Sequence, residues 1–424
     1  MPSGSFRGGI THGLTMYGAW EGELYTVNQS GETTLYSTNL SGTDYPFFGR
    51  NSATTPGIVV VKDNSAFIVN TTASAVQNYP DADVGSPTCC CGYLGFVFFG
   101  YGDGTLQVTN YNTTEINTLN QARTASNPDG IKNIFGYNGQ IYAMGANTVE
   151  IWGEPVNATG FPLTRVGFNI LPGLLASHAV AGWEPEYGYQ PMYVGSDSTV
   201  RQLNGYQAAK VSPTDLDREI AAIPIGSIES INALVYSTGG HAFWQLNLPS
   251  GKSWVYYVNE GSWHERKSQY RTNSKLARSI YFSERWCVGD VESSDLLAVD
   301  ATAHTEGGAE ITAVMESGPA KAFPNRMRIP RCDFDFTPGV GIATGTDPVQ
   351  TDPSVLLEVS LDGGRTWPTS WVRKLGKQAK SNKRIYVLNA GVSNDEGARW
   401  RWSVSDPVHV GFTGANMDLQ VGNK

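Results

Sequence analysis

Residues 135–152 read FGYNGQIYAMGANTVEIW, and they carry the clearest structural signal in the chain. An apolar run meets the pair Asn138-Gly139, a second apolar run follows that pair, and a Gly-Ala-Asn turn leads to a third run that ends at Trp152. Asn-Gly tolerates the positive φ angles of a two-residue hairpin turn and is the strongest short-range hairpin signal. The stretch therefore predicts three consecutive antiparallel strands.

Related strand-pair phrases recur along most of the chain. Seven of them are centred on an aromatic residue, namely Tyr25, Phe67, Phe98, Tyr142, Tyr193, Phe243 and Trp286. Most of their spacings match the roughly 40–50 residues of a four-stranded propeller blade. The shorter spacing of 31 residues between Phe67 and Phe98 indicates a repeat that is degenerate or forms only part of a blade. Six blades closed by strands from both ends of the repeat region are therefore as compatible with the pattern as seven.

The composition agrees with an all-β fold. Of the 424 residues, 48 are glycine and 22 are proline, while only 16% are charged, which is typical of a protein with many strands and turns. One segment, 214–223, has a helical pattern and follows Pro213, so a helix with an N-cap after that proline is expected.

The pattern changes near residue 310. The segments 331–336, 355–360 and 399–404 are longer strands, and the first and last of them alternate with period two. We predict an irregular β-propeller of about six or seven blades over residues 1–310. An additional C-terminal, sandwich-like β module is expected over residues 311–424.

The charge balance bears on DNA and membranes. With 30 lysines and arginines against 39 aspartates and glutamates, the net charge is −9, which disfavours tight DNA wrapping because phosphate binding needs clustered cations. An acidic protein can still surround DNA without gripping it. The sequence has no apolar run near the roughly 20 residues of a membrane helix and no apolar core of a signal peptide near its start. We expect synthesis in the cytoplasm and no membrane insertion by this chain.

The cysteines and histidines give no metal pattern. Cys89, Cys90 and Cys91 are consecutive, and neighbouring strand residues point to opposite faces, so we interpret all five cysteines as small buried thiols. The six histidines show no spacing typical of metal ligands. We therefore name no catalytic, cofactor-binding or metal residue, and expect no cofactor and no enzymatic activity.

Two motifs have both a structural and a chemical interpretation. Residues 360–367 fit the S-x-D-x-G-x-T-W Asp box that resembles the hairpin turns of sialidases. A sialidase has several copies in its blades, whereas this copy stands alone outside the propeller segment, which favours a structural turn. Residues 263–266 (Trp-His-Glu-Arg) place a histidine beside an acid and a base at a strand end. Adjacent strand positions face opposite ways, which favours a surface ion pair beside a packed tryptophan.

The order of several phrases adds a family resemblance. After 136–152 come Gly160-Phe161-Pro162-Leu163-Thr164-Arg165-Val166-Gly167, the run 200–206 (VRQLNGY), the run 263–266, and at the end the runs 361–367 and 405–408. This order resembles the packaged-DNA stabilisation proteins of short-tailed bacteriophages, also called tail hub or nozzle proteins. The resemblance extends from about residue 18 to 420 and is firmest over 132–290.

The resemblance implies a structural virion protein. It implies a propeller-based subunit, six copies of which form a tube below the portal and adaptor (head-to-tail connector) rings. It further implies contacts with a tailspike or tail fibre at the side and with a tail needle or plug at the tip. The tube would retain packaged double-stranded DNA and conduct it during ejection without specific binding. In such a ring, strands 355–360 and 399–404 are candidates to pair or pack between neighbours.

Two other classes remain open from the sequence alone. The Asp box and the aromatic content are compatible with a glycan-binding or sialidase-like propeller. An intracellular protein-interaction propeller is disfavoured because the Trp-Asp strand endings of WD40 repeats are absent from the sequence.

Overall fold

A computed structural model describes residues 2–40, 44–71, 74–124, 129–153, 160–249 and 251–422. The chain divides into two compact units. The first comprises residues 1–267 and 271–301, and the second comprises residues 268–270 and 302–424. Residues 302–310, which the sequence analysis assigned to the propeller, thus belong to the second unit.

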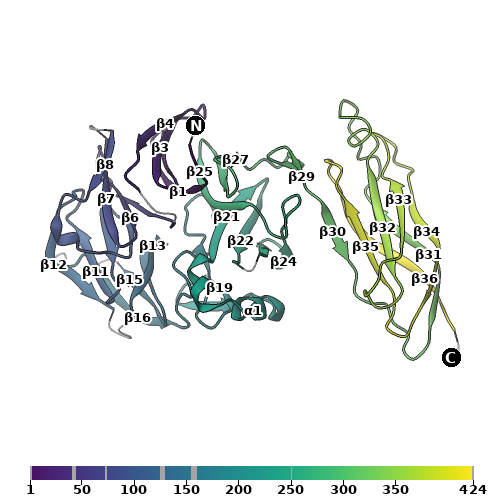
Figure 1. Cartoon of the computed structure of the whole chain (residues 1–424). Helices are drawn as coiled ribbons and strands as arrows, with labels where there is room; N and C mark the ends of the chain where they lie inside the picture. The colour runs from purple at the N-terminus through teal and green to yellow at the C-terminus, as the bar shows by residue number, and fades with distance from the viewer. Residues whose placement is uncertain are drawn as a thin grey trace. The chain divides into compact units, whose positions relative to one another are not determined.

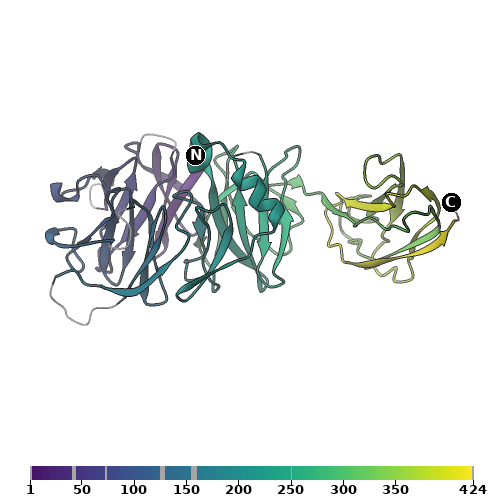
Figure 2. The same cartoon turned by 90° about the horizontal axis from the view of Figure 1, so that it is seen from below.

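The first unit is a propeller of seven antiparallel sheets within the described residues (Figures 1 and 2). Six blades have four strands and the seventh has three. Blades 1 to 3 consist of β1 (Phe6–His12), β2 (Thr15–Trp20), β3 (Glu23–Val27) and β4 (Thr33–Ser37); β5 (Phe47–Arg50), β6 (Ile58–Lys62), β7 (Ser65–Asn70) and β8 (Ala75–Asn78); and β9 (Cys89–Tyr93), β10 (Phe96–Gly100), β11 (Thr105–Thr109) and β12 (Ile116–Arg123).

The remaining blades follow in chain order. They consist of β13 (Ile131–Tyr137), β14 (Gln140–Gly145), β15 (Val149–Gly153) and β16 (Thr164–Ile170); β17 (Val180–Ala181), β18 (Met192–Val194), β19 (Val200–Asn204) and β20 (Gln207–Lys210); β21 (Asn232–Thr238), β22 (His241–Asn247), β23 (Ser253–Tyr257) and β24 (Ser262–Glu265); and β25 (Leu276–Phe282), β26 (Arg285–Asp290) and β27 (Leu296–Ala298). The first strand of each blade is the innermost, and β25 packs beside β1 as well as β21, so the seventh blade closes the ring against the first.

Two expectations about the repeats are wrong. The blades around Phe67 and Phe98 are both complete, and the two markers are close in sequence because Phe67 stands on the third strand of its blade, β7, and Phe98 on the second strand of the next, β10. The incomplete blade is the last one, around Trp286. Every blade is built from consecutive strands, so the ring closes by blade packing and not by strands contributed from both ends.

The Asn-Gly hairpin is confirmed. Asn138 and Gly139 have φ angles of 48° and 78°, and Tyr137 pairs with Gln140 directly across the turn. Two positive φ angles are the mark of the hairpin turn whose twist matches that of the flanking strands.

The consecutive cysteines join two blade interfaces. Cys89 and Cys91 pack with Ile131 and Ile134 of blade 4, whereas Cys90 packs with Val59 and Val61 of blade 2. All five cysteines are free and buried, and burial raises the pKa of the Cys89 thiol to about 12. They serve as small core residues, as expected.

The short helices lie between blades. The predicted helix is α1 (Thr214–Ala221), but its N-cap is Pro213, whose side chain makes no capping hydrogen bond. Two 3-10 turns are η1 (Ala82–Val84) and η2 (Ile225–Ser230). The expectation of a cap after Pro213 is therefore wrong, because the chain already turns helical at Thr214.

The second unit is a β-sandwich preceded by a small hairpin (Figure 1). One sheet has the order β30-β35-β32-β33 and the other β34-β31-β36. Alternate residues of β32, namely Val355, Leu357 and Val359, are buried in the core of this unit. The strands, in chain order, are β28 (Thr305–Glu306), β29 (Ala309–Glu310), β30 (Ala313–Glu316), β31 (Met327–Phe336), β32 (Ser354–Ser360), β33 (Thr369–Lys374), β34 (Ile385–Ser393), β35 (Arg399–Val404) and β36 (Phe412–Val421).

The long strands of the second unit pair with one another. Both sides of β32 and β35 are occupied, because β32 lies between β35 and β33 and β35 lies between β30 and β32. The strands 355–360 and 399–404 therefore have no free edge for pairing with a neighbouring copy, and that half of the expectation is wrong; the other half, that they pack between copies, stays a prediction. The edge strands of the two sheets are β30, β33, β34 and β36.

The inner strands of blades 2 and 3 approach so closely that a side chain at Gly92 has no room. A Cβ atom there would lie 2.0 Å from the backbone oxygen of Arg50 in β5. We expect Gly92→Ala to lower the free energy of unfolding by about 1–3 kcal/mol, as overpacked sites do. Chemical denaturation followed by circular dichroism measures this change.

The matched control is Gly226→Ala, because a Cβ at Gly226 would meet no atom within 4 Å. This variant should unfold within about 0.5 kcal/mol of the parent protein. Equal stability of the two variants would contradict the close approach of β5 and β9.

Candidate functional site

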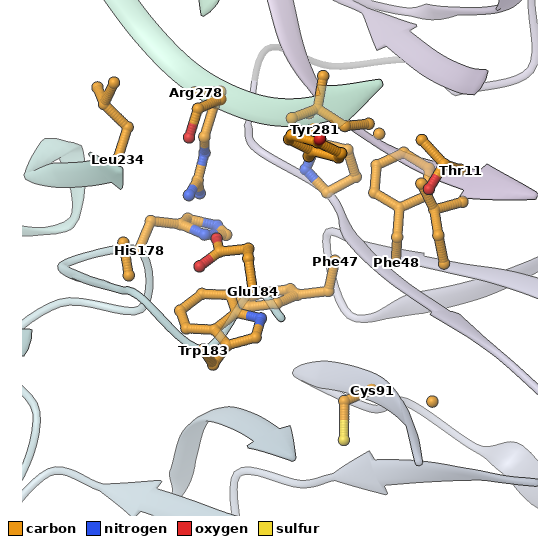
Figure 3. A pocket seen from close by; sticks show the side chains of 18 of the residues that line it. Thr11, Phe47, Phe48, Cys91, His178, Trp183, Glu184, Leu234, Arg278 and Tyr281 are labelled. Carbon is orange, nitrogen blue, oxygen red and sulfur yellow. The ribbon is translucent and has the colours of Figure 1, made fainter. Parts of the chain in front are cut away.

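The central channel of the propeller is a cavity that the described residues of the first unit form around the ring axis. It has a volume of about 380 Å³ and is lined by residues from the innermost strands of all seven blades. Figure 3 shows the side chains that project into it, from Thr11 and Phe48 on one side to Leu234 and Arg278 on the other. Because every blade contributes, the channel exists only in the closed ring.

The segment 182–191, which we call the plug segment, contributes Trp183, Glu184, Pro185 and Glu186 to the lining of the channel. The innermost strand of blade 5, β17, ends after only two residues, and the chain then enters this segment. Trp183 stacks on Phe135 of blade 4 at 5.0 Å between ring centroids, while Tyr187 meets Trp286 of blade 7 edge-on at 6.4 Å. The plug segment is thus held by blades on both sides of blade 5.

The channel also contains a cluster of cationic and aromatic side chains. The guanidinium groups of Arg7 and Arg278 lie over the ring of Tyr45, at 5.1 and 4.6 Å from its centroid. His178 stacks on Phe47 with 4.5 Å between centroids and meets Tyr45 edge-on at 5.5 Å. Five residues from blades 1, 2, 5 and 7 and their links therefore form one packed group.

Enclosure changes the acid–base properties of this group. Burial, with a further contribution from the positive charge of Arg278, lowers the pKa of His178 well below its usual value, so the imidazole is neutral at pH 7. Burial also lowers the pKa of Arg278 to about 10, which leaves it charged at neutral pH. Burial raises the pKa of Glu184 in the plug segment, although a hydrogen bond of 2.9 Å from the Gly182 N–H opposes this effect.

The size of the channel limits what it can hold. Its volume of about 380 Å³ corresponds to about a dozen water molecules at roughly 30 Å³ each. Double-stranded DNA, whose major groove alone is about 12 Å wide, cannot pass through it. The channel can hold water or a small ligand.

No metal centre is evident in the part of the chain that the structure describes, where no three His, Cys, Asp or Glu side chains gather as ligands. No helix among the described residues is long and apolar enough to cross a membrane.

The Asp box forms the structural turn that its sequence favours. The carboxylate of Asp362 accepts hydrogen bonds from the backbone N–H groups of Arg365 and Thr366, at 3.1 and 2.9 Å. The hydrogen bonds from the Thr366 hydroxyl and N–H, together with that from the Ser360 hydroxyl, lower the pKa of Asp362. The Arg401 guanidinium covers the ring of Trp367 at 4.2 Å. The motif closes the hairpin between β32 and β33 of the second unit.

Residues 263–266 do not form a catalytic group. The Trp263 indole N–H donates to the Val211 carbonyl oxygen at 2.8 Å, which confirms a packed tryptophan. Glu265 pairs with Lys252 at 3.2 Å and with Lys267 at 3.4 Å, so an ion pair is present, but with other partners than its sequence neighbours. The Arg266 side chain donates to the Tyr236 hydroxyl at 2.9 Å.

Sequence reasoning did not identify Arg7, His178 or Arg278. They stand in three unrelated phrases, and only closure of the ring brings them together. Arg7 is followed by glycine and Arg278 by serine near the start of a strand, and this pattern is too common to indicate a site.

The neutral state of His178 predicts a pH-dependent stability. Because its pKa is lower in the folded than in the unfolded protein, the unfolded state binds the extra proton as the pH falls below about 6.5, the usual histidine pKa. The free energy of unfolding therefore decreases as the pH falls below that value, by at most about 1.4 kcal/mol for each pH unit. We expect His178→Gln to flatten this slope in denaturation experiments between neutral and mildly acidic pH.

His264→Gln is the control for this experiment, since His264 is exposed on β24. It should keep the slope of the parent protein. If His178→Gln and the parent lose stability in parallel, the enclosed neutral histidine is contradicted.

The comparisons with curated proteins and solved structures give no match of high sequence identity. No curated protein matches it. Among solved structures, PorZ of the Porphyromonas gingivalis type-IX secretion system matches with 11% identity and a TM-score of 0.40, over 70% of this chain and 38% of that chain. The designed protein Ika8 has 12% identity and a TM-score of 0.41, over 69% and 86% of the two chains. The WD40 propeller of Doa1 has 9% identity and a TM-score of 0.42, over 69% and 92%.

A family model gives a more specific match. The model described as the β-propeller of bacteriophage P22 Gp10, a phage stabilisation family, matches residues 2–304. These residues contain all seven blades of the first unit. The chain therefore belongs to the phage stabilisation family of the P22 Gp10 β-propeller.

Proposed function

We propose that this chain is a subunit of a ring-shaped tail hub, or nozzle, that retains packaged DNA and conducts it during ejection. The observation that carries the proposal is the family match over residues 2–304, which makes the chain a phage structural protein. In the proposal the protein is made in the host cytoplasm, assembles into the virion tail and has no enzymatic activity.

The dimensions of the propeller bear on the path of the DNA. Because the channel of one propeller holds only about 380 Å³, the DNA must pass outside each propeller. We propose a lumen bounded by several copies, six by the family resemblance, below the portal and adaptor rings. A tailspike or tail fibre would bind at the side of the ring, and a needle or plug at its tip.

The charges on the propeller support a conduit that does not bind its cargo. We use the name hairpin face for the turns between the first and second and between the third and fourth strands of the blades. In their described residues these turns carry glutamates and no lysine or arginine: Glu32, Glu115, Glu184, Glu186, Glu260 and Glu284. Exposed Arg50 and Arg285 stand next to these turns at strand ends, and Glu184 lies in the channel, so the face is predominantly but not uniformly acidic. A predominantly acidic surface repels DNA phosphates.

The opposite face is acidic too, but mixed. We use the name connection face for the turns between second and third strands and for the segments that link blades. Asp83, Asp215 and Asp295 are exposed there, whereas Lys267, Arg271 and Lys275 all stand in the link between blades 6 and 7. Lys275 is neutralised by Asp290 at 2.7 Å, and Arg271 pairs with Glu292. Either face could therefore border a lumen that phosphates do not adhere to.

The first test is assembly. We expect the purified protein, mixed with the adaptor protein of the same phage, to form a ring of six copies that electron microscopy and mass photometry detect. A chain that stays a single subunit and never joins adaptor complexes would count against the proposal.

The second test reverses charge on one face at a time. Lysines at Glu32, Glu115 and Glu260 change the hairpin face, and lysines at Asp83, Asp215 and Asp295 change the connection face. All six side chains are exposed, so each triple variant is the control for the other. We expect one of them to slow DNA release from assembled particles, measured by dye binding to the ejected DNA, because added cations attract phosphates. Unchanged release from both would refute the repulsive lumen.

A further inference from the structure

The bulged residues of three inner strands share one chemical character. A β-bulge inserts an extra residue into one strand and commonly redirects its side chain next to a functional site. In β1, β13 and β25 the register shifts past a single residue, which is Arg7, Lys132 and Arg278, respectively. A basic residue therefore occupies the bulge of blades 1, 4 and 7.

Lys132 is a bulged basic residue whose ammonium group has hydrogen-bond partners within the protein. Its ammonium group donates to the Leu175 carbonyl oxygen at 2.7 Å and to the Glu229 carboxylate at 2.8 Å. Both partners belong to the neighbouring part of the ring, so Lys132 joins blade 4 to the segments that follow it. This bulge has a structural explanation.

Arg278 lacks such an explanation. It adopts a φ angle of 53°, a left-handed conformation that costs free energy for a residue with a side chain. Its Nε is inaccessible to solvent and has no hydrogen-bond partner in the structure. Its guanidinium rests on the ring of Tyr45 at 4.6 Å and lines the channel, where Figure 3 shows it pointing toward His178.

Arg7, from the adjacent blade, faces the same ring from a distance of 5.1 Å. Its Nη2 lies 3.5 Å from a Glu21 oxygen, while its Nε, like that of Arg278, is buried without a partner. Two cations thus share one aromatic ring, with a single carboxylate beside Arg7. Like charges held together in an enclosed site are unfavourable unless an anion compensates them.

The Glu184 carboxylate compensates the charge of Arg278 only in part: the two groups attract each other, but burial raises the pKa of Glu184 and so favours its neutral form. Glu184 of the plug segment points into the same space in Figure 3, but its Oε2 accepts the Gly182 N–H of its own segment at 2.9 Å. Among the described residues, Glu184 and Arg278 form no ion pair within 4.0 Å. His178 is neutral, so it adds a hydrogen-bonding group and no charge.

We propose that the channel binds a small oxyanion between Arg278 and Arg7, with the fork of Arg278 as its main donor. A guanidinium matches the spacing of two oxygens in a phosphate or carboxylate group. The cavity of about 380 Å³ has room for such a group with its water, at roughly 30 Å³ for each water molecule. This site is independent of the proposed conduit, because DNA does not enter the channel.

The test uses the full chain and inorganic phosphate as the probe. Isothermal titration calorimetry at constant ionic strength should show one saturable site. We expect Arg278→Gln to weaken phosphate binding by about tenfold or more, the equivalent of one lost charge-assisted contact. Arg7→Gln should weaken it by a smaller factor. Arg285→Gln, which changes an arginine of the same blade that does not line the channel, should bind within about twofold of the parent.

Acetate in place of phosphate distinguishes the two sources of the oxyanion. Tighter phosphate binding indicates a phosphate or phosphoester, and tighter acetate binding indicates a carboxylate, such as that of a peptide; either result supports the site. Arg278→Lys is a second variant in case Arg278→Gln misfolds. It keeps the positive charge but lacks the guanidinium fork, so we expect it to bind phosphate several-fold more weakly than the parent protein. Heats no larger than those of chloride at equal ionic strength, or equal binding by the parent and both Arg278 variants, would overturn the proposal.

Discussion

The close packing of seven inner strands around one axis is the constraint on which the rest of the structure depends. A blade cannot bury both of its faces alone, so each sheet is stable only between two neighbours. At the axis the neighbouring backbones come so near that Gly92 of β9 lies against Arg50 of β5 without space for a Cβ atom. Bulges interrupt the inner strands β1, β13 and β25, where one residue of each leaves the regular ladder.

Closure of the ring also determines which residues meet. The seventh blade has three strands and packs its first strand, β25, against β1 of the first blade. Residues at the two ends of the propeller sequence, Arg7 and Arg278, therefore face the same tyrosine ring. After the short β17 the plug segment lines the channel with Trp183 and Glu184. This packing leaves a channel that can hold only water or a small ligand. The interior of each propeller is therefore separate from any route that DNA could take.

Local signals explain which parts of the fold were predictable. Asn138-Gly139 imposes its turn through the φ angles of two residues, so the hairpin at 135–152 follows from sequence alone. The Asp box is equally local, since Asp362 bonds the backbone three and four residues ahead. The blade count was ambiguous because the aromatic markers do not lie on equivalent strands: Tyr25 and Phe67 stand on third strands, whereas the five later markers stand on second strands. The cluster of Arg7, His178 and Arg278 could not be predicted from the sequence, because these residues are far apart in the chain and meet only when the ring closes.

The distribution of charge is the last link between the fold and the proposed conduit. The chain has a net charge of −9. Several of its cationic side chains form ion pairs within the propeller: Lys132 links blade 4 to Glu229, and Lys275 pairs with the buried Asp290 at 2.7 Å. Lys62 is buried as well, where its ammonium group donates to the Leu40 carbonyl oxygen at 3.0 Å. Cations committed to the interior cannot reach phosphates outside, while exposed turns keep glutamates such as Glu115 and Glu260. The same packing that stabilises the ring therefore removes several cations from its surface, which favours the proposed passage of DNA without tight binding.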